Sequence, residues 1–180
     1  MLSTNFYKRI NYLLKKDTKT KVILTFILDR IKHPFLSIKK KKLKKIHQKY
    51  LNKKKISVDY FSIYTYYWQN ILNKYFDQLS YLEIGSWEGN SALYILKNFK
   101  TKKVVCVDIW KDKDHSDIQE RNFRNFKSNM KIFKKRFQMH KGTSDSFFKK
   151  NKDTFDVIYI DGSHEADQVY RDLRNSWNSL

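Results

Sequence analysis

The sequence predicts an α/β fold, a parallel β-sheet with helices on both faces, preceded by basic N-terminal helices. Two observations carry this prediction. From residue 81 onward, short apolar runs alternate with segments of helical spacing, and the apolar runs are nearly continuous. Strands of this kind are buried on both faces, as in parallel sheets covered by helices. The chain has room for four such strand–helix units.

Residues 1–58 are predicted to be a basic helical extension. Apolar residues recur at helical spacing over 6–14 and 23–31, and Pro34 is expected to end the second helix. A lysine-rich helix is expected at 38–55, with a narrow apolar stripe on an otherwise cationic surface. The extension therefore lacks the wide apolar face of a core helix.

The positive charge is concentrated in the N-terminal part of the chain. Residues 1–75 carry a net charge of +16, out of +20 for the whole chain. Residues 38–55 are either a solvated connector or a surface that meets an anionic partner, which would be RNA, DNA or anionic lipid. The sequence leaves these alternatives open.

Residues 59–180 are predicted to form the main domain, which begins with an aromatic-rich helix. That helix, at 59–76, places six apolar side chains on one face: Phe61, Tyr64, Trp68, Ile71, Leu72 and Tyr75. The elements expected after it are a strand at 81–86, a helix through Ala92, Leu93, Leu96 and Phe99, a strand at 104–110, a helix carrying Phe123, Phe126 and Met130, a weaker strand at 137–144, a strand at 155–163, and a helix through Val169, Leu173 and Trp177.

Polar residues of interest follow the ends of the predicted strands, where open α/β sheets bind their ligands. The first strand runs into "EIGSWEG", which has the spacing Glu83-x-Gly85-x-x-x-Gly89. Trp87 stands where a dinucleotide-binding loop needs its middle glycine, so a pyrophosphate is not expected. The E-x-G-x-x-x-G spacing is typical of the glycine turn of S-adenosylmethionine enzymes, in which both glycines clear space for the ligand.

Two further strand ends carry carboxylates. Asp108 ends the second strand, 25 residues after Glu83, and a carboxylate there can accept hydrogen bonds from both ribose hydroxyls of a nucleoside. Asp161 ends the fourth strand within "IDGSHEAD", and His164 follows in the turn. A histidine of near-neutral pKa is suited to take a proton from an attacking hydroxyl. The alternative is that Asp161 and His164 only shape the start of the next helix.

The segments "LEIGSWEGNSA", "VVCVDIW" and "FDVIYIDGSHEADQVYRDL" resemble class I S-adenosylmethionine-dependent methyltransferases. They are most similar to the branch with D-G-S-H after the fourth strand, which includes macrolide-sugar O-methyltransferases. The resemblance covers about residues 59–180 and implies a Rossmann-like fold with S-adenosylmethionine as cofactor. The family sheet has seven strands, of which four are expected here, so the sequence favours a fragment of a longer protein.

The resemblance also implies roles for individual residues. His164 would be the general base and Asp161 a ligand of a divalent metal such as Mg²⁺. The residues themselves leave open whether Asp161 orients the histidine, positions the acceptor or binds the metal. The third strand ends in "GTS", where the superfamily often has an acidic residue, so Ser144 is the weaker adenine contact. The cofactor-binding residues implied are Glu83, Gly85, Ser86, Gly89, Asp108, Ile109, Trp110 and Ser144.

The function expected from these features is O-methylation of a small hydroxylated acceptor such as a sugar. The alternative is a nucleic-acid-binding or RNA-methylating protein that uses the basic N-terminal region. Cys106 lies in an apolar run and, as the only cysteine, excludes an internal disulfide. No signal peptide or bilayer-spanning run is expected, so we predict a cytoplasmic protein, with peripheral attachment to a membrane as a further hypothesis.

Overall fold

The computed structural model describes residue 8, residues 11–12, residue 14, residues 20–111 and residues 116–180. The chain divides into two compact units, residues 1–42 and residues 43–180, and each is described by itself. Among the described residues, none of the helices is both long enough and apolar enough to cross a membrane.

Helix α2 (Thr20–Leu51) is continuous, so the expected helix end at Pro34 is wrong. A proline removes one backbone donor and weakens a helix locally. The residues after it are mostly leucine, lysine and glutamine, which are strong helix formers and sustain the helix beyond that position. Of the helix expected through Phe6, Ile10, Leu13 and Leu14, the first three of these residues lie outside the described ones, and Leu14 is helical.

The predicted parallel sheet of four strands is confirmed. The strands are β1 (Leu79–Ile84), β2 (Thr101–Asp108), β3 (Gln138–Lys141) and β4 (Val157–Ile160), in the order β3-β2-β1-β4. All neighbouring strands pair in parallel. The helices and turns between them are η1 (Ser62–Tyr64), α3 (Thr65–Tyr75), α4 (Asn90–Asn98), α5 (Ser116–Met130), η2 (Lys131–Phe133), α6 (Ser144–Phe148) and α7 (Ala166–Trp177).

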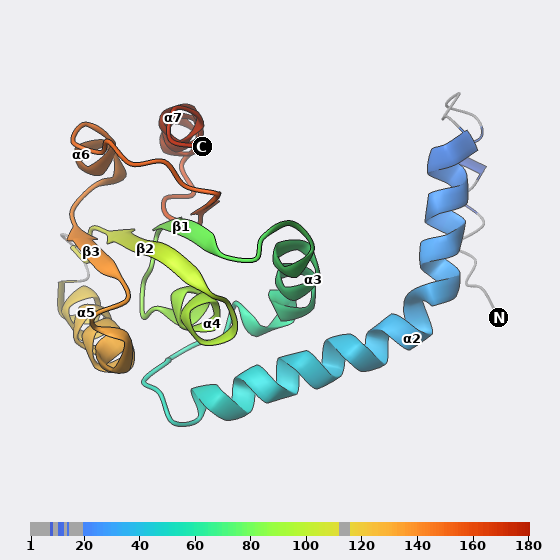
Figure 1. Cartoon of the computed structure of the whole chain (residues 1–180), viewed down its shortest axis with the longest axis horizontal. Coiled ribbons are helices and arrows are strands. Elements are labelled where there is room, and N and C mark those ends of the chain that lie inside the picture. The colour runs from blue at the N-terminus through green and yellow to red at the C-terminus, as the bar shows by residue number, and fades with distance from the viewer. Residues whose placement is uncertain (1–7, 9–10, 13, 15–19, 112–115) are drawn as a thin grey trace. The chain divides into compact units, whose positions relative to one another are not determined.

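The core lies on both faces of the sheet, because successive side chains of a strand point to opposite faces. One cluster joins residues of β1 and β2 to α3, α4 and α5, and it includes Tyr81, Cys106 and Phe126. The other cluster joins Leu82 and Val105 to Phe155 and the short helix α6. Helices α4 and α5 accordingly lie on one side of the sheet, and α6 and α7 on the other (Figure 1).

The aromatic face expected over residues 59–76 is only partly correct. Phe61 and Leu72 are buried, whereas Tyr64, Ile71 and Tyr75 are exposed. The segment begins with the 3₁₀ turn η1 and not as an α-helix. A 3₁₀ turn has about three residues per turn, which rotates the following α-helical face relative to the residues before it.

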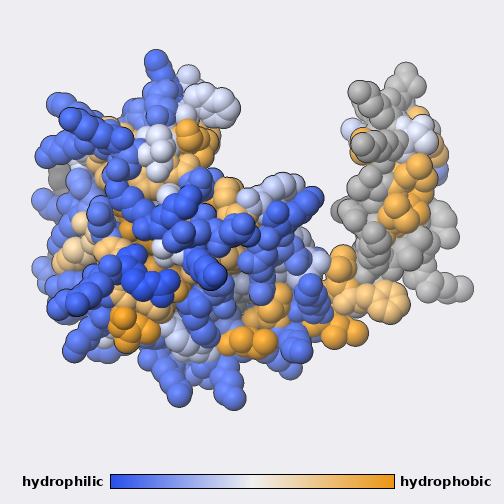
Figure 2. Space-filling model, in the orientation of Figure 1, coloured by the Kyte–Doolittle hydropathy of each residue, from blue (hydrophilic) through white to orange (hydrophobic). Residues whose placement is uncertain are grey.

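The surface of the sheet-containing unit is largely polar. Hydrophilic side chains cover much of its visible face (Figure 2). Exceptions include Trp177, Leu173 and Tyr170, which are all exposed on α7. Helix α7 therefore presents apolar side chains to solvent that a core helix would bury.

Candidate functional site

The carboxyl ends of the four strands meet at one edge of the sheet, as the parallel pairing requires. Gly85 follows β1 and donates its N–H to Val107 O (2.8 Å), and Asp161 follows β4 and donates its N–H to Ile84 O (2.8 Å). Gly142, after β3, donates its N–H to Asp108 O (2.9 Å). The structure therefore brings the glycine turn, Asp108 and Asp161 to the same edge.

Gly85 is required by the protein's own backbone. It has φ +91°, and a Cβ at this position would lie 2.1 Å from Asp161 O. Gly89 has φ +85°, and its Cβ would meet the ring of Phe126 at 3.1 Å. The sequence predicted that these glycines clear space for a ligand. The structure gives a different reason, because the turn must pass close to β4 and to α5.

The carboxylate of Asp108 accepts hydrogen bonds from two residues of strained backbone conformation, Trp87 and Trp110. Trp87 and Trp110 are the described non-glycine residues with positive φ, at 44° and 39°. Asp108 Oδ2 accepts a hydrogen bond from the N–H of Trp87 (2.8 Å), and Oδ1 accepts one from the N–H of Trp110 (2.8 Å). Such φ values cost free energy and persist where the surroundings impose them. One carboxylate thus fixes the loops after both β1 and β2.

The ionisation of Asp108 reflects two opposing effects. Burial raises the pKa of this carboxyl, and the backbone N–H donors around it, those of Trp110 and Trp87 first, lower it. The net shift is upward. The N–H groups of Ile109 and Ser86 also lower the pKa, so the backbone on both sides of this carboxylate stabilises its charge.

The three other predicted adenine-side residues differ in accessibility. Ile109 is 45% exposed beside Asp108 and is free to cover a ligand. Trp110 is buried against Phe126, and its Nε1 donates to Trp87 O (2.7 Å). Ser144 is also buried, and its Oγ donates to Asp172 Oδ1 (2.5 Å). The structure thus gives Trp110 a packing role and Ser144 a hydrogen-bonding role, and the adenine contacts implied by the resemblance stay predictions.

Glu83 lies beneath the glycine turn and is fully buried. Its carboxylate accepts hydrogen bonds from Tyr81 Oη (2.8 Å) and Ser91 Oγ (2.8 Å). The pKa of Glu83 is raised to about 7, because burial and the charge of Asp161 together outweigh the lowering effect of the hydroxyl donors. Glu83 therefore stabilises the glycine turn from the buried interior of the sheet, and a ligand would bind on the solvent side of the turn.

Ser86 is a buried residue of the turn. Its Oγ makes no hydrogen bond of good geometry in the structure. A weaker hydrogen bond from the Ser86 side chain lowers the pKa of both Glu83 and Cys106, so this hydroxyl interacts with the buried residues of β1 and β2.

Asp161 and His164 lie at the carboxyl end of β4 and are both exposed. Tyr159 Oη donates to Asp161 Oδ2 (2.9 Å). Burial raises the pKa of Tyr159, as does its contact with the Asp161 carboxylate. Across the described residues, no hydrogen bond joins Asp161 to His164, so the expected orientation of the histidine by Asp161 is not seen.

A metal site at Asp161 finds no support. The described residues contain no group of three or more histidine, cysteine, aspartate or glutamate side chains arranged to hold a metal ion. Asp161 alone does not fit Mg²⁺, which needs several oxygen ligands in octahedral geometry. No chemical step is therefore assigned to a metal.

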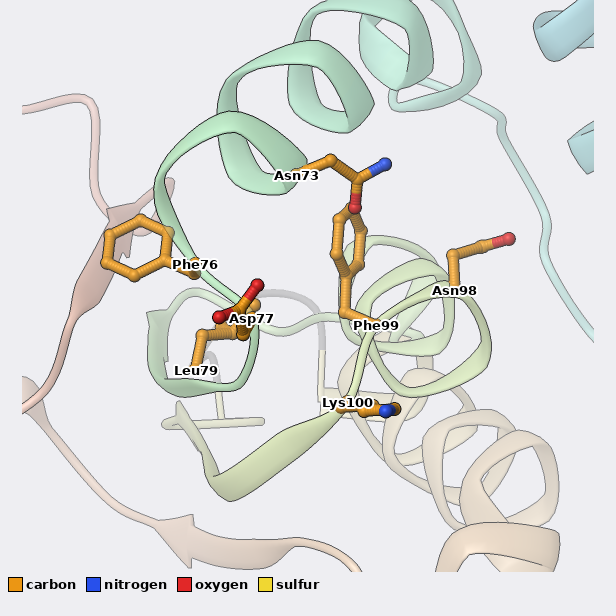
Figure 3. A pocket seen from close by; sticks show the side chains of 7 residues that line it. All are labelled: Asn73, Phe76, Asp77, Leu79, Asn98, Phe99 and Lys100. Carbon is orange, nitrogen blue, oxygen red and sulfur yellow. The ribbon is translucent and has the colours of Figure 1, made fainter.

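A hollow of about 300 Å³ lies at the opposite edge of the sheet. Its lining includes Leu79, at the start of β1, and Lys100, directly before β2 (Figure 3). Ligands of open parallel sheets bind at the carboxyl ends of the strands. This hollow is therefore not the predicted site.

Sequence reasoning missed the side chains that hold the segment before η1 to the glycine turn. His47, Asp59, Glu88 and Asn90 form hydrogen bonds that reach up to 43 residues along the chain. The signal available was the aromatic start of residues 59–76, whose Tyr60 now lies against Trp87. The hydrogen-bonding residues themselves belong to no sequence motif that would have predicted these contacts.

The chain is similar in fold to several solved structures, of which it spans 35–65% of the length. A conserved hypothetical protein of Streptococcus pyogenes has 14% identity and a TM-score of 0.49, over 63% of this chain and 65% of that one. Spermidine synthase of Thermotoga maritima has 20% identity and a TM-score of 0.43, over 58% and 35%. An O-methyltransferase of Bacillus cereus in complex with SAH has 19% identity and a TM-score of 0.37, over 57% and 44%.

No curated protein matches the chain. Residues 82–180, which run from β1 to the end of the sequence, match the family described as methyltransferase domain. These residues include the glycine turn, Asp108, Asp161 and His164. Because the match covers more than half of the 180 residues, the chain belongs to the methyltransferase domain family.

Proposed function

We propose that this chain binds S-adenosylmethionine at the carboxyl ends of β1 and β2 and transfers its methyl group to a hydroxyl oxygen of a small acceptor such as a sugar. The observation that carries the proposal is the glycine turn clamped by Asp108 beside Asp161. Family membership supports methyl transfer. The D-G-S-H sequence at residues 161–164 favours an oxygen acceptor over an amine.

Different residues of the turn would contact different parts of the cofactor. The backbone of Gly85 and Gly89 and the hydroxyl of Ser86 line the methionine and ribose side. Asp108 accepts the ribose hydroxyls, and Ile109 covers adenine. Glu83 acts from beneath the turn through Ser91, because it is fully buried.

The chemistry needs a proton acceptor next to the methyl group. When bound, S-adenosylmethionine supplies a methyl group on a sulfonium, which an oxygen nucleophile displaces to leave S-adenosylhomocysteine. His164 takes the proton of the acceptor hydroxyl as the new carbon–oxygen bond forms. Asp161, held by Tyr159, positions the acceptor.

The test is methyl transfer from S-adenosylmethionine to a panel of glycosides, followed as a mass gain of one methylene. His164→Ala should lower kcat by about two to four orders of magnitude, the range for a positioned base. The dissociation constant of S-adenosylmethionine should not change. Glu165→Gln is the matched control, because Glu165 is exposed in the same turn and makes no side-chain cap to α7.

Two results would oppose this assignment. A parent chain that methylates none of the glycosides would remove the acceptor class. Unchanged kcat in His164→Ala, together with a lower melting temperature, would give His164 a structural role and leave Asp161 as the catalytic candidate. Methyl transfer and the melting temperature are measured on the same protein samples.

A second candidate is nucleic-acid binding through the basic region, on its own or as part of RNA methylation. It is favoured by the +16 charge of residues 1–75 and by the exposed lysines of α2 at positions 41, 42, 45 and 49. Phosphate contacts release counterions, so affinity should fall steeply with salt. Replacing these lysines with glutamine should flatten that slope in a filter-binding assay. No retention of RNA or DNA at low salt, with retention on anionic vesicles, would favour a peripheral membrane role.

A further inference from the structure

The segment between α2 and η1 is tied to the glycine turn, although it lies outside the family match at 82–180. We call residues 52–61 the strap. Its side chains and backbone reach residues on both flanks of Gly89. The strap thus belongs physically to the cofactor site, and its contribution rests on the function proposed above.

The first anchor is the carboxylate of Glu88, which is fully buried. Its Oε2 accepts hydrogen bonds from the N–H of Ser57 (2.6 Å) and from Ser57 Oγ (2.9 Å). Its Oε1 accepts one from Asn125 Nδ2 (2.7 Å). A buried carboxylate needs its acceptor sites filled, and the strap fills one side of Glu88.

The second anchor is Asn129 of α5. Its Nδ2 donates to Glu88 O (3.0 Å) and to Lys55 O (3.0 Å), and its Oδ1 accepts from the N–H of Lys55 (2.7 Å). One buried amide therefore binds the strap and the glycine turn at once. This arrangement fixes the distance between them.

The third anchor lies on the other flank of Gly89. Asn90 Nδ2 donates to Asp59 Oδ1 (3.0 Å), and Asn90 Oδ1 is 2.8 Å from His47 Nε2. Gln48 Nε2 donates to Asp59 Oδ2 (3.0 Å). Burial lowers the pKa of His47, which favours the neutral ring in this contact.

Tyr60 is held over the glycine turn by these anchors. It follows Asp59 directly and precedes Phe61, which is buried in the core. Tyr60 itself is 68% exposed, and its ring centroid lies 5.7 Å from that of Trp87 with an interplanar angle of 33°. Tyr60 is exposed and Trp87 is half-buried, so the pair presents an ordered aromatic surface beside the glycine turn.

Trp87 is fixed as firmly as Tyr60. Its N–H donates to Asp108, and its carbonyl accepts from Trp110 Nε1. With the Asn122 amide in the orientation that satisfies both groups, Asn122 Oδ1 accepts from Trp87 Nε1 (2.7 Å). Both rings are thus held at the part of the turn expected to line the methionine side of the cofactor.

We propose that Tyr60 and Trp87 form an aromatic recognition site for the sulfonium cation of S-adenosylmethionine, with Asp59 as the positioning residue for Tyr60. Aromatic faces attract ligand cations, and onium groups are their preferred partners. The site therefore distinguishes the charged methyl donor from S-adenosylhomocysteine, which is the neutral thioether product. The chain would release its product more readily than it releases its substrate.

The test is calorimetric titration of the full chain with both ligands. Tyr60→Ala should raise the dissociation constant of S-adenosylmethionine about tenfold and that of S-adenosylhomocysteine by a clearly smaller factor. Tyr60→Phe keeps the ring and should restore the parent preference. Tyr75→Ala is the matched control, because Tyr75 is 65% exposed at the C-terminal end of α3, next to the hollow at the amino edge of the sheet.

A double-mutant cycle tests the positioning role of Asp59. Asp59→Asn should weaken S-adenosylmethionine binding in the parent and have no further effect in the Tyr60→Ala background. Equal losses for both ligands in Tyr60→Ala, or a loss no larger than in Tyr75→Ala, would overturn the inference. A parent chain that binds neither ligand would instead overturn the proposed function, and the inference with it.

Discussion

The two halves of the sheet differ in how completely the chain covers them. In the half around β1, five of the six strand residues are buried, and so are the first seven residues of α4. In the half around β4, all four strand residues are only half-buried. Helix α7 exposes Leu173 and Trp177 there. Strand β1 and helix α4 are thus packed on both faces, whereas the strand that leads to Asp161 and His164 is more open.

This difference assigns stability and chemistry to different elements. The buried half contains Glu83 and Glu88, whose carboxylates are satisfied by hydrogen bonds. Strand β4 lies at the edge of the described sheet, beside β1. Apolar edge strands are usually covered by another element. We therefore expect changes to buried residues of the β1 half to cost more stability than changes to the β4 half.

The largest loss of stability is expected for Gly85→Ala, because Gly85 lies where the loop after β1 passes the backbone that follows β4. A Cβ at Gly85 would lie 2.1 Å from Asp161 O, on a backbone with φ +91°. We expect a loss of about 3–5 kcal/mol in the free energy of unfolding, measured by urea denaturation.

Gly162→Ala is the control for this change, since Gly162 is the partner glycine after β4. Its Cβ would meet Ile84 Cγ2 at 3.4 Å, which is an ordinary contact. The free energy of unfolding should change by no more than about 1 kcal/mol. Similar losses in the two variants would show that the close approach of β1 to β4 is not what requires Gly85.

A smaller effect is expected from pH acting on Glu83 in the buried half. Its pKa is raised to about 7 in the folded chain from an ordinary value of 4.5. The folded chain therefore binds more protons than the unfolded chain between these values, and this carboxyl lowers stability as the pH rises through that window. Glu83→Gln cannot ionise. The stability of the parent relative to Glu83→Gln should fall by roughly 2–3 kcal/mol between pH 5 and pH 8.

Urea titrations of both proteins at several pH values measure this difference. The comparison with Glu83→Gln removes the contributions of all other carboxyl groups, which the two proteins share. Parallel curves for parent and variant would contradict the raised pKa.

The smallest effect is expected on the open half. Trp177→Ser removes a side chain that is 77% exposed, and it should change the free energy of unfolding by less than about 0.5 kcal/mol. Leu93→Ala, in the fully buried part of α4, should cost about 2–5 kcal/mol in the same assay. A loss above about 1 kcal/mol in Trp177→Ser that depends on protein concentration would show that another copy covers this face.

The fold was predictable from sequence because its signals are local. Three apolar runs and one weaker run, each followed by a helical pattern, define the parallel sheet without knowledge of any long-range contact. Pro34 misled the prediction of a helix end, since one missing backbone donor does not outweigh the strong helix formers after it.

The site was predictable only as a set of positions. The glycine spacing and Asp108 marked the right edge of the sheet, but the reason for Gly85 depends on the backbone of Asp161, 76 residues away. The resemblance implied adenine contacts for Trp110 and Ser144, and nothing in the sequence indicated their neighbours Phe126 and Asp172, which lie on other elements. A strand-end position does not reveal which way a side chain turns.

The central claim is that the half around β1 and β2 holds an S-adenosylmethionine site organised by Asp108. Calorimetric titration of the parent and Asp108→Asn tests it most directly, with Asp156→Asn as control. Asp156 also accepts a backbone N–H, that of Ser80 (2.7 Å), but at the amino edge of the sheet. We predict one cofactor per chain for the parent and the control, and at least about tenfold weaker binding for Asp108→Asn. Equal affinities in all three proteins, or no binding by the parent, would contradict the account.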